Sequence, residues 1–239
     1  MLGIGLSGLA INGVRMIMLA SVSNLDIEAQ MFFYGSGLFL AICTVLAYRF
    51  TNEYQNDKMC RQYKQSYSMR ERWNETLEVY KVNWKEGWSV ALTFAVQFSF
   101  YPGVMLEYQF SFIPNFNWFV IVVVTYASLG DSLGRWLAGI RDLISKAALW
   151  KVCMARNVFF TTAYLLTFEG VWPRFLGNQV YVIIMLGLFA TTCGYLTTIG
   201  MKYGSDESTK NRGLAGTLMG MHLSFGICLG STLALAFLS

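Results

Sequence analysis

Long apolar blocks alternate with shorter polar stretches along the chain. Each apolar block holds about 20 residues, roughly the number that an α-helix needs to cross a hydrocarbon core of ~30 Å. Transmembrane β-strands would instead alternate in polarity over ~10 residues. The pattern therefore predicts an all-α integral membrane protein with about seven transmembrane helices. The expected spans are residues 2–23, 30–49, 87–106, 116–136, 148–168, 178–200 and 213–238.

One long polar stretch separates the second expected span from the third. It divides the chain into two helices over residues 1–50, a polar loop over 51–86 and a five-helix bundle over 87–239. The loop is rich in charged and aromatic residues and contains no Pro, so we expect it to be partly helical. It is either a solvated connector or an amphipathic helix that lies at the membrane surface or docks a partner.

Composition and charge strengthen the membrane assignment. Hydrophobic residues make up 55% of the chain and charged residues 13%, with a mean hydropathy of +0.44. The net charge of +4 is unevenly placed and does not indicate nucleic-acid binding. Eight basic residues lie between Arg49 and Lys85 and six more in two later loops, whereas the loops of the other face hold only Arg174. The positive-inside rule then places the N-terminus and the 51–86 loop on the cytoplasmic or matrix side and the C-terminus on the opposite side.

A few charged residues fall inside the expected spans, where each ion needs a partner or a wet cavity. Asp131 and Arg135 are four residues apart, which places opposite charges on one helix face. They form either a structural ion pair or a polar surface that contacts a solute. Arg156 lies eight residues into its span and can extend to the interface, whereas Arg15 is deeper. His222, the single histidine, makes an interhelical hydrogen bond or relays protons.

Small residues and one proline predict how the helices pack. Pairs of glycines four residues apart let helix backbones approach closely in a membrane. Pro102 removes a backbone donor and should bend or break its helix, as in helices that line transporter cavities. The paired glycines of the last span are Gly216, Gly220, Gly226 and Gly230, and the first span contains Gly3, Gly5, Gly8 and Gly13.

The sequence contains no arrangement of residues typical of an enzyme. The five cysteines are scattered, and neither a metal-ligand cluster nor a nucleophile with a neighbouring base is evident. We therefore expect no enzymatic activity, no metal and no cofactor.

Six short motifs follow one another along the chain. They are SGLAINGVRMI, FYPGVMLE, SLGDSLGR, MARNVF, TTCGYL and AGTLMGMHLSFGICLG. In this order they resemble the last seven helices of the equilibrative nucleoside transporters. The resemblance implies a partial major-facilitator-like bundle that lacks the first four helices of the family, and thus most of one of its two bundles.

The resemblance also assigns roles to individual positions. It implies substrate-facing positions at Asp131, Arg135, Pro102 and Ser128. It implies structural or packing positions at Gly8, Gly13, Gly134, Arg156, Gly216, Gly220, Gly226 and Gly230. Three positions depart from the family: Leu9 replaces a Gln, and Ser128 and Cys193 each replace an Asn. These changes delete amide groups that could hold a base or a ribose.

Two functions are consistent with these observations. The first, which the missing helices and lost amides favour, is a transporter-derived structural or accessory subunit of a larger membrane protein complex, with reduced or no transport. The alternative is a facilitative nucleoside or nucleobase transporter that a separate first-half chain or dimerisation completes. The expected partners are the lipid bilayer, other membrane subunits and nucleosides, but not nucleic acid. The mitochondrial inner membrane is a location that follows only from the first function.

Overall fold

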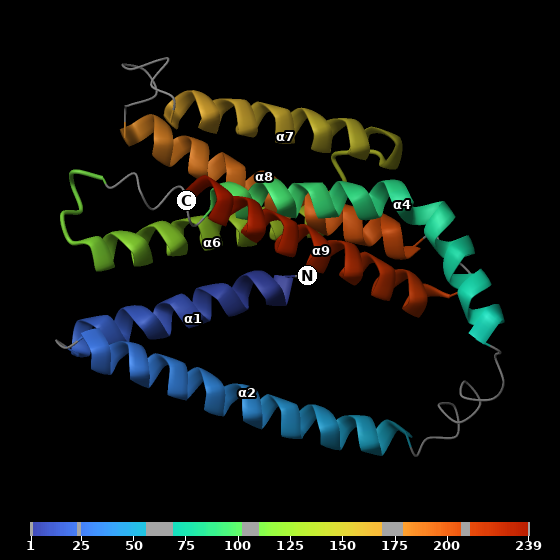
Figure 1. Ribbon diagram of the computed structural model, residues 1–239, viewed down its shortest axis with the longest axis horizontal. Coiled ribbons are helices and arrows are strands. Elements are labelled where there is room, and N and C mark those ends of the chain that lie inside the picture. Colours follow the sequence, from blue (N-terminus) through green and yellow to red (C-terminus); the bar gives the residue numbers. More distant parts are fainter. Residues whose placement is uncertain are drawn as a thin grey trace. The chain divides into compact units, whose positions relative to one another are not determined.

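The computed structural model describes residues 2–22, 25–55, 69–101, 110–168, 179–206 and 211–238. Within these ranges every secondary-structure element is an α-helix, which confirms the predicted fold class. Each expected span overlaps one helix (Figure 1). The helices are α1 (Leu2–Ser21), α2 (Leu25–Gln55), α4 (Met69–Phe100), α6 (Phe116–Ile140), α7 (Lys146–Phe168), α8 (Gln179–Asp206) and α9 (Arg212–Leu238).

Four of the described helices are long and apolar enough to cross a membrane. The qualifying segments are Gln30–Asn52 of α2, Phe116–Ile140 (all of α6), Gln179–Asp206 (all of α8) and Arg212–Ala236 of α9. In α1 the apolar part is the shorter segment Leu6–Ser21. The polar residues Lys151, Arg156 and Asn157 lower the hydropathy of α7. The lengths and apolar composition of these helices are those of a multi-pass membrane protein.

Helix α4 begins well before the span that the hydropathy pattern predicts. It starts at Met69, so that residues 69–86 of the polar stretch are helical, in agreement with the expectation that this stretch is partly helical, and α2 likewise continues to Gln55. The segment from Met69 to Glu86 lacks both Pro and Gly and carries Glu71 in its first turn, where a negative charge is favourable. Helical propensity therefore extends α4 upstream of residue 87, where the hydropathy pattern alone places its start.

The described chain divides into two units. One comprises Gly13–Leu77, and the other comprises Met1–Asn12 with Glu78–Ser239. In the first unit the Arg15 guanidinium carbon lies 5.8 Å from the centroid of the Phe32 ring, within the range of a cation–π interaction. This ring contact is one of the ways in which the unit accommodates the charge of Arg15.

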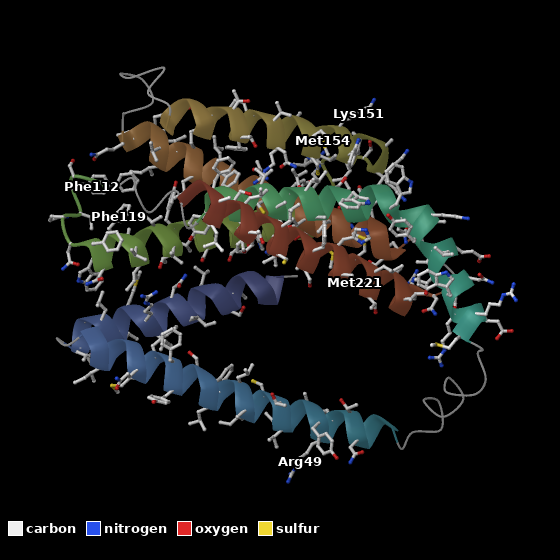
Figure 2. The ribbon with its side chains drawn as sticks, in the orientation of Figure 1. Arg49, Phe112, Phe119, Lys151, Met154 and Met221 are labelled. Atoms are coloured by element: carbon white, nitrogen blue, oxygen red, sulfur yellow. The ribbon has the colours of Figure 1, made fainter. Side chains whose placement is uncertain are left out.

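The second unit is a helical bundle in which α6 and α8 make the most extensive contact. Its largest apolar cluster includes Phe119 of α6 and Phe189 of α8, both fully buried, and Phe160 of α7, whose ring centroid is 4.8 Å from that of Phe189. In contrast, Lys151 extends outward from α7 and Met221 outward from α9 (Figure 2). Close packing rather than exclusion of water holds such helices together in lipid.

Local hydrogen bonds define the helix ends of the bundle. The Asn115 side chain accepts hydrogen bonds from the backbone of Asn117 and Trp118 and so caps α6, and Asn211 caps α9 through the Leu214 N–H.

Two tyrosines of α8 hold the connector between α6 and α7. The Tyr195 hydroxyl accepts from Leu143 N at 2.6 Å and donates to Arg141 O at 3.2 Å, and Tyr203 donates to Ile144 O at 2.8 Å. These bonds fix where α7 begins relative to α8.

Candidate functional site

An ion pair on α6 is the centre of the candidate site. Arg135 Nε donates to Asp131 Oδ2 at 2.6 Å, and Arg135 Nη2 donates to Asp131 Oδ1 at 3.3 Å. One guanidinium thus contacts both oxygens of one carboxylate, the strongest arrangement for such a pair. The pairing expected from the four-residue spacing is present.

The two members of the pair differ in exposure. The Asp131 side chain is 25% exposed, whereas that of Arg135 is only 5% exposed. Each carboxylate oxygen can accept about two hydrogen bonds, so the pair leaves acceptor capacity on Asp131. The arrangement is a partly open carboxylate whose charge is balanced by a buried cation, and it can accept hydrogen bonds from the hydroxyl or N–H groups of a polar solute.

Polar groups from α1 extend this surface. Asn12 Nδ2 donates to Ser128 Oγ at 3.1 Å, and Ser128 lies three residues before Asp131 on the same side of α6. A Cβ at Gly8 would lie 3.7 Å from Ser128 Oγ, an ordinary van der Waals contact. The sequence analysis did not identify Asn12. The signal that could have found it is an amide inside an apolar span, which usually has a polar partner on another helix.

Helix α8 lies directly behind the ion pair. A Cβ at Gly194 would collide with the Asp131 carbonyl oxygen and would lie 2.9 Å from Asp131 Oδ1. Reciprocally, a Cβ at Gly134 would collide with Thr191 O and would lie 2.7 Å from Tyr195 N. Only glycine permits such an approach of two backbones. This contact positions Asp131, because its main chain and its carboxylate both lie against α8.

Three further positions from the sequence analysis remain to be located, Pro102, Cys193 and Leu9. Pro102 lies outside the described residues. Cys193 is 2% exposed and therefore buried beside Gly194, so its thiol does not face an open surface. Leu9 lies one helical turn from Asn12, so α1 does present an amide to α6 although the position that resembles the family Gln lacks one.

The paired glycines of α9 have different surroundings. Cβ atoms at Gly226 and Gly230 would collide with the carbonyl oxygens of Ala91 and Ala95, which places these glycines in the α4–α9 interface. At Gly216 and Gly220, no described atom lies within 4 Å of such a Cβ, and the same holds at Gly13 of α1. A packing role for these three stays a prediction.

Arg156 does not extend to the membrane interface. It is 6% exposed and connects three helices. Its guanidinium donates to Gln97 Oε1 of α4 at 3.1 Å, to Asn157 Oδ1 of α7 at 3.0 Å and to Phe189 O of α8 at 2.9 Å. It also lies 4.5 Å from the centroid of the Phe189 ring. Because these bonds satisfy a buried charge between helices, Arg156 is a structural cross-link.

The contacts of His222 differ from those expected. Its Nδ1 lies 2.8 Å from Leu218 O of the same helix, so this hydrogen bond is not interhelical. Between helices the imidazole stacks on Tyr80 with 5.8 Å between ring centroids and meets the edge of Trp88 at the same distance. The ring is therefore packed between α4 and α9 by aromatic contacts. Among the described residues, no three or more His, Cys, Asp or Glu side chains gather closely enough to hold a metal ion.

Comparison with known proteins connects this geometry with a family. Residues 62–238 match the family model described as nucleoside transporter. The chain belongs to the nucleoside transporter family. The match includes α4, α6, α7, α8 and α9, and hence the Asp131–Arg135 pair and the Arg156 cross-link.

Individual relatives of this nucleoside transporter family member share about a quarter of its aligned residues. The equilibrative nucleotide transporter 8 of Arabidopsis thaliana is 26% identical over 165 residues, which cover 67% of this chain and 41% of the relative. The adenosine transporter 1 of Crithidia fasciculata is 23% identical over 156 residues, or 62% and 30%. The equilibrative nucleoside transporter 4 of Homo sapiens is 26% identical over 157 residues, or 65% and 29%. The chain thus spans about two fifths of the length of the first relative and about three tenths of the other two.

Proposed function

We propose that this chain forms one part of a facilitative pathway for nucleosides or nucleobases, in which Asp131 contacts the solute and Arg135 balances its charge. The observation that carries the proposal is the unequal exposure of the pair. Arg135 is buried, while a quarter of the Asp131 side chain remains accessible. The accessible acceptors of the Asp131 carboxylate are available to a solute, whereas a fully buried carboxylate would have none to offer.

The chemistry of a nucleoside suits such a surface. Ribose hydroxyls and base N–H groups are donors that the free lone pairs of Asp131 can accept, and hydrogen bonds to a charged group contribute more than neutral ones. Asn12 and Ser128 add an amide and a hydroxyl on the same side. Family membership supports the same solute class.

The test is the uptake of tritiated uridine and adenosine by cells that lack endogenous nucleoside transport and express this chain together with the chain that completes the pathway. Asp131→Asn removes the charge at nearly constant size. We expect the initial rate of uptake to fall about 10-fold or more at equal surface expression, because a charged hydrogen bond to the solute is lost.

The matched control is Asp142→Asn, which removes an aspartate that pairs with Lys202 at 2.7 Å at an exposed position. Its uptake should stay within twofold of the parent protein, because exposed ion pairs contribute little. Equal uptake by Asp131→Asn and the parent protein would exclude a role of this carboxylate in transport.

A second candidate function is a structural or accessory subunit of a larger membrane protein complex with reduced or no transport. The specific observation in its favour is that the positions resembling the amides of the family hold Leu9, Ser128 and Cys193, of which Cys193 is buried. Uptake that is absent from the parent protein, together with stable co-purification of other subunits, would favour this function. A mitochondrial inner membrane location belongs to this second candidate alone.

We also propose the orientation in which the basic loops face the cytoplasm or the matrix. It can be tested with single cysteines at Ser111, between α4 and α6, and at Ser145, between α6 and α7, in a protein whose five native cysteines are replaced by serine. Both serines are exposed. We expect a membrane-impermeant maleimide to label Ser145→Cys from the side of the basic loops and Ser111→Cys from the opposite side. Labelling of both from one side would contradict the orientation.

A further inference from the structure

Two buried polar residues of α4 lie away from the candidate site. Asn83 and Glu86 are each 4% exposed. They are three residues apart, so their side chains leave the helix on the same side. This part of α4 approaches α8, because a Cβ at Gly200 would lie 3.9 Å from Glu86 O. The two side chains are therefore inside the bundle, where an unbonded polar group is costly.

Most of their polar atoms lack a partner among the described residues. Both amide atoms of Asn83 and Oε2 of Glu86 are buried and make no hydrogen bond. The other carboxylate oxygen, Glu86 Oε1, lies 3.5 Å from Lys146 Nζ at the start of α7. That distance is long for a charged hydrogen bond, which usually measures about 2.7–2.9 Å. Buried polar atoms in folded proteins are almost always bonded, so these three atoms need a partner that the described residues do not supply.

The types of the unbonded atoms define the ligand. Asn83 Nδ2 is a donor and needs an acceptor, whereas Asn83 Oδ1 and Glu86 Oε2 are acceptors and need donors. A metal cation cannot accept the bond from Nδ2, and the ammonium of Lys146 already balances the charge of Glu86. An anion would be repelled by the negative charge of the Glu86 carboxylate. Only a neutral group that both donates and accepts satisfies all three atoms.

We propose that Asn83 and Glu86 bind an internal water molecule that bridges the two side chains inside the α4–α7–α8 bundle. Water is the smallest ligand with both kinds of hydrogen-bonding group, and buried waters typically make about three hydrogen bonds to otherwise unbonded atoms. The almost complete burial of both residues excludes a solute as large as a nucleoside. The site therefore differs from the Asp131 surface, and it does not depend on the transport function.

A substitution distinguishes a hydrated site from a dry one by the sign of its effect. In a dry site Asn83→Leu removes an unbonded amide and should raise the melting temperature of the purified protein. In a hydrated site it removes up to two hydrogen bonds of the water, and loss of the water would also leave Glu86 Oε2 unbonded. We expect the melting temperature to fall by about 3 °C or more. Asn74→Leu, at an exposed position of the same helix, is the matched control and should change it little.

A second measurement addresses the water directly and uses the unmodified protein. After a brief X-ray pulse in H₂¹⁸O, hydroxyl radicals formed from bound water oxidise the adjacent side chains, which mass spectrometry detects. We expect label on Glu86 and none on Phe189, which is fully buried in an apolar cluster although phenylalanine is more reactive. No more label on Glu86 than on Phe189, or a higher melting temperature for Asn83→Leu, would overturn the proposal.

Discussion

Replacing Arg156 by Met should lower the stability of the bundle by about 3 to 5 kcal/mol, because breaking a buried charged network leaves its partners unbonded. Gln97 Oε1 and Asn157 Oδ1 would each lose the guanidinium that donates to them. For a chain of this size the loss corresponds to a decrease in melting temperature of about 10 °C or more. Thermal unfolding of the detergent-purified protein, followed by tryptophan fluorescence, measures it.

The effect should be specific to the network of Arg156. Lys151→Met removes a cation from the exposed side of the same helix, where the side chain extends outward (Figure 2), and should leave the melting temperature nearly unchanged. Arg156→Lys should give an intermediate loss, because an ammonium keeps the charge but cannot contact three helices with a planar fork. Equal melting temperatures for Arg156→Met and Lys151→Met would show that the bonds of Arg156 do not stabilise the bundle.

The second large effect is expected at the contact between α6 and α8. Gly134→Ala adds a methyl group that would collide with Thr191 O and lie 2.7 Å from Tyr195 N. Since the obstructing atoms belong to a helix backbone, they cannot rotate away, and the helices must separate. Overpacking usually costs about 1–3 kcal/mol, and this rigid case should lie at the upper end.

The control for this substitution is on the same helix. At Gly139 no described atom lies within 4 Å of an added Cβ. Gly139→Ala should therefore be neutral or slightly stabilising, because alanine has the higher helix propensity. A Gly134→Ala protein that unfolds at the same temperature as the Gly139→Ala protein would contradict the close contact of α6 and α8.

Hydropathy predicts the helices because crossing lipid requires an apolar block of defined length. It does not predict the start of α4 at Met69, since a helix can continue in polar sequence beyond the apolar block. Similarly, the Asp131–Arg135 pair follows from local spacing, whereas the bond from Asn12 to Ser128 joins residues 116 positions apart. Contacts of that range depend on which helix faces meet, and a single sequence does not specify this.

Two further residues illustrate the same limit. The distance of Arg156 from the end of its span is compatible with reaching the interface, but its acceptors on α4 and α8 keep it inside the bundle. The last helix contains two glycine pairs with identical spacing. Only Gly226 and Gly230 lie against a described helix, because the two pairs occupy different parts of the α9 surface. Spacing therefore predicts that a close approach is possible, but not where it occurs.

The reciprocal seating of Gly134 and Gly194 restricts how the bundle can move. The main chain of the opposite helix lies directly against each of these glycines. Shifting α6 along α8 by even one residue would replace a glycine at the contact with a residue whose side chain collides with that backbone. Interfaces of this kind resist shear. A rearrangement that changes the exposure of Asp131 is therefore expected to displace α6 and α8 together rather than to slide one helix along the other.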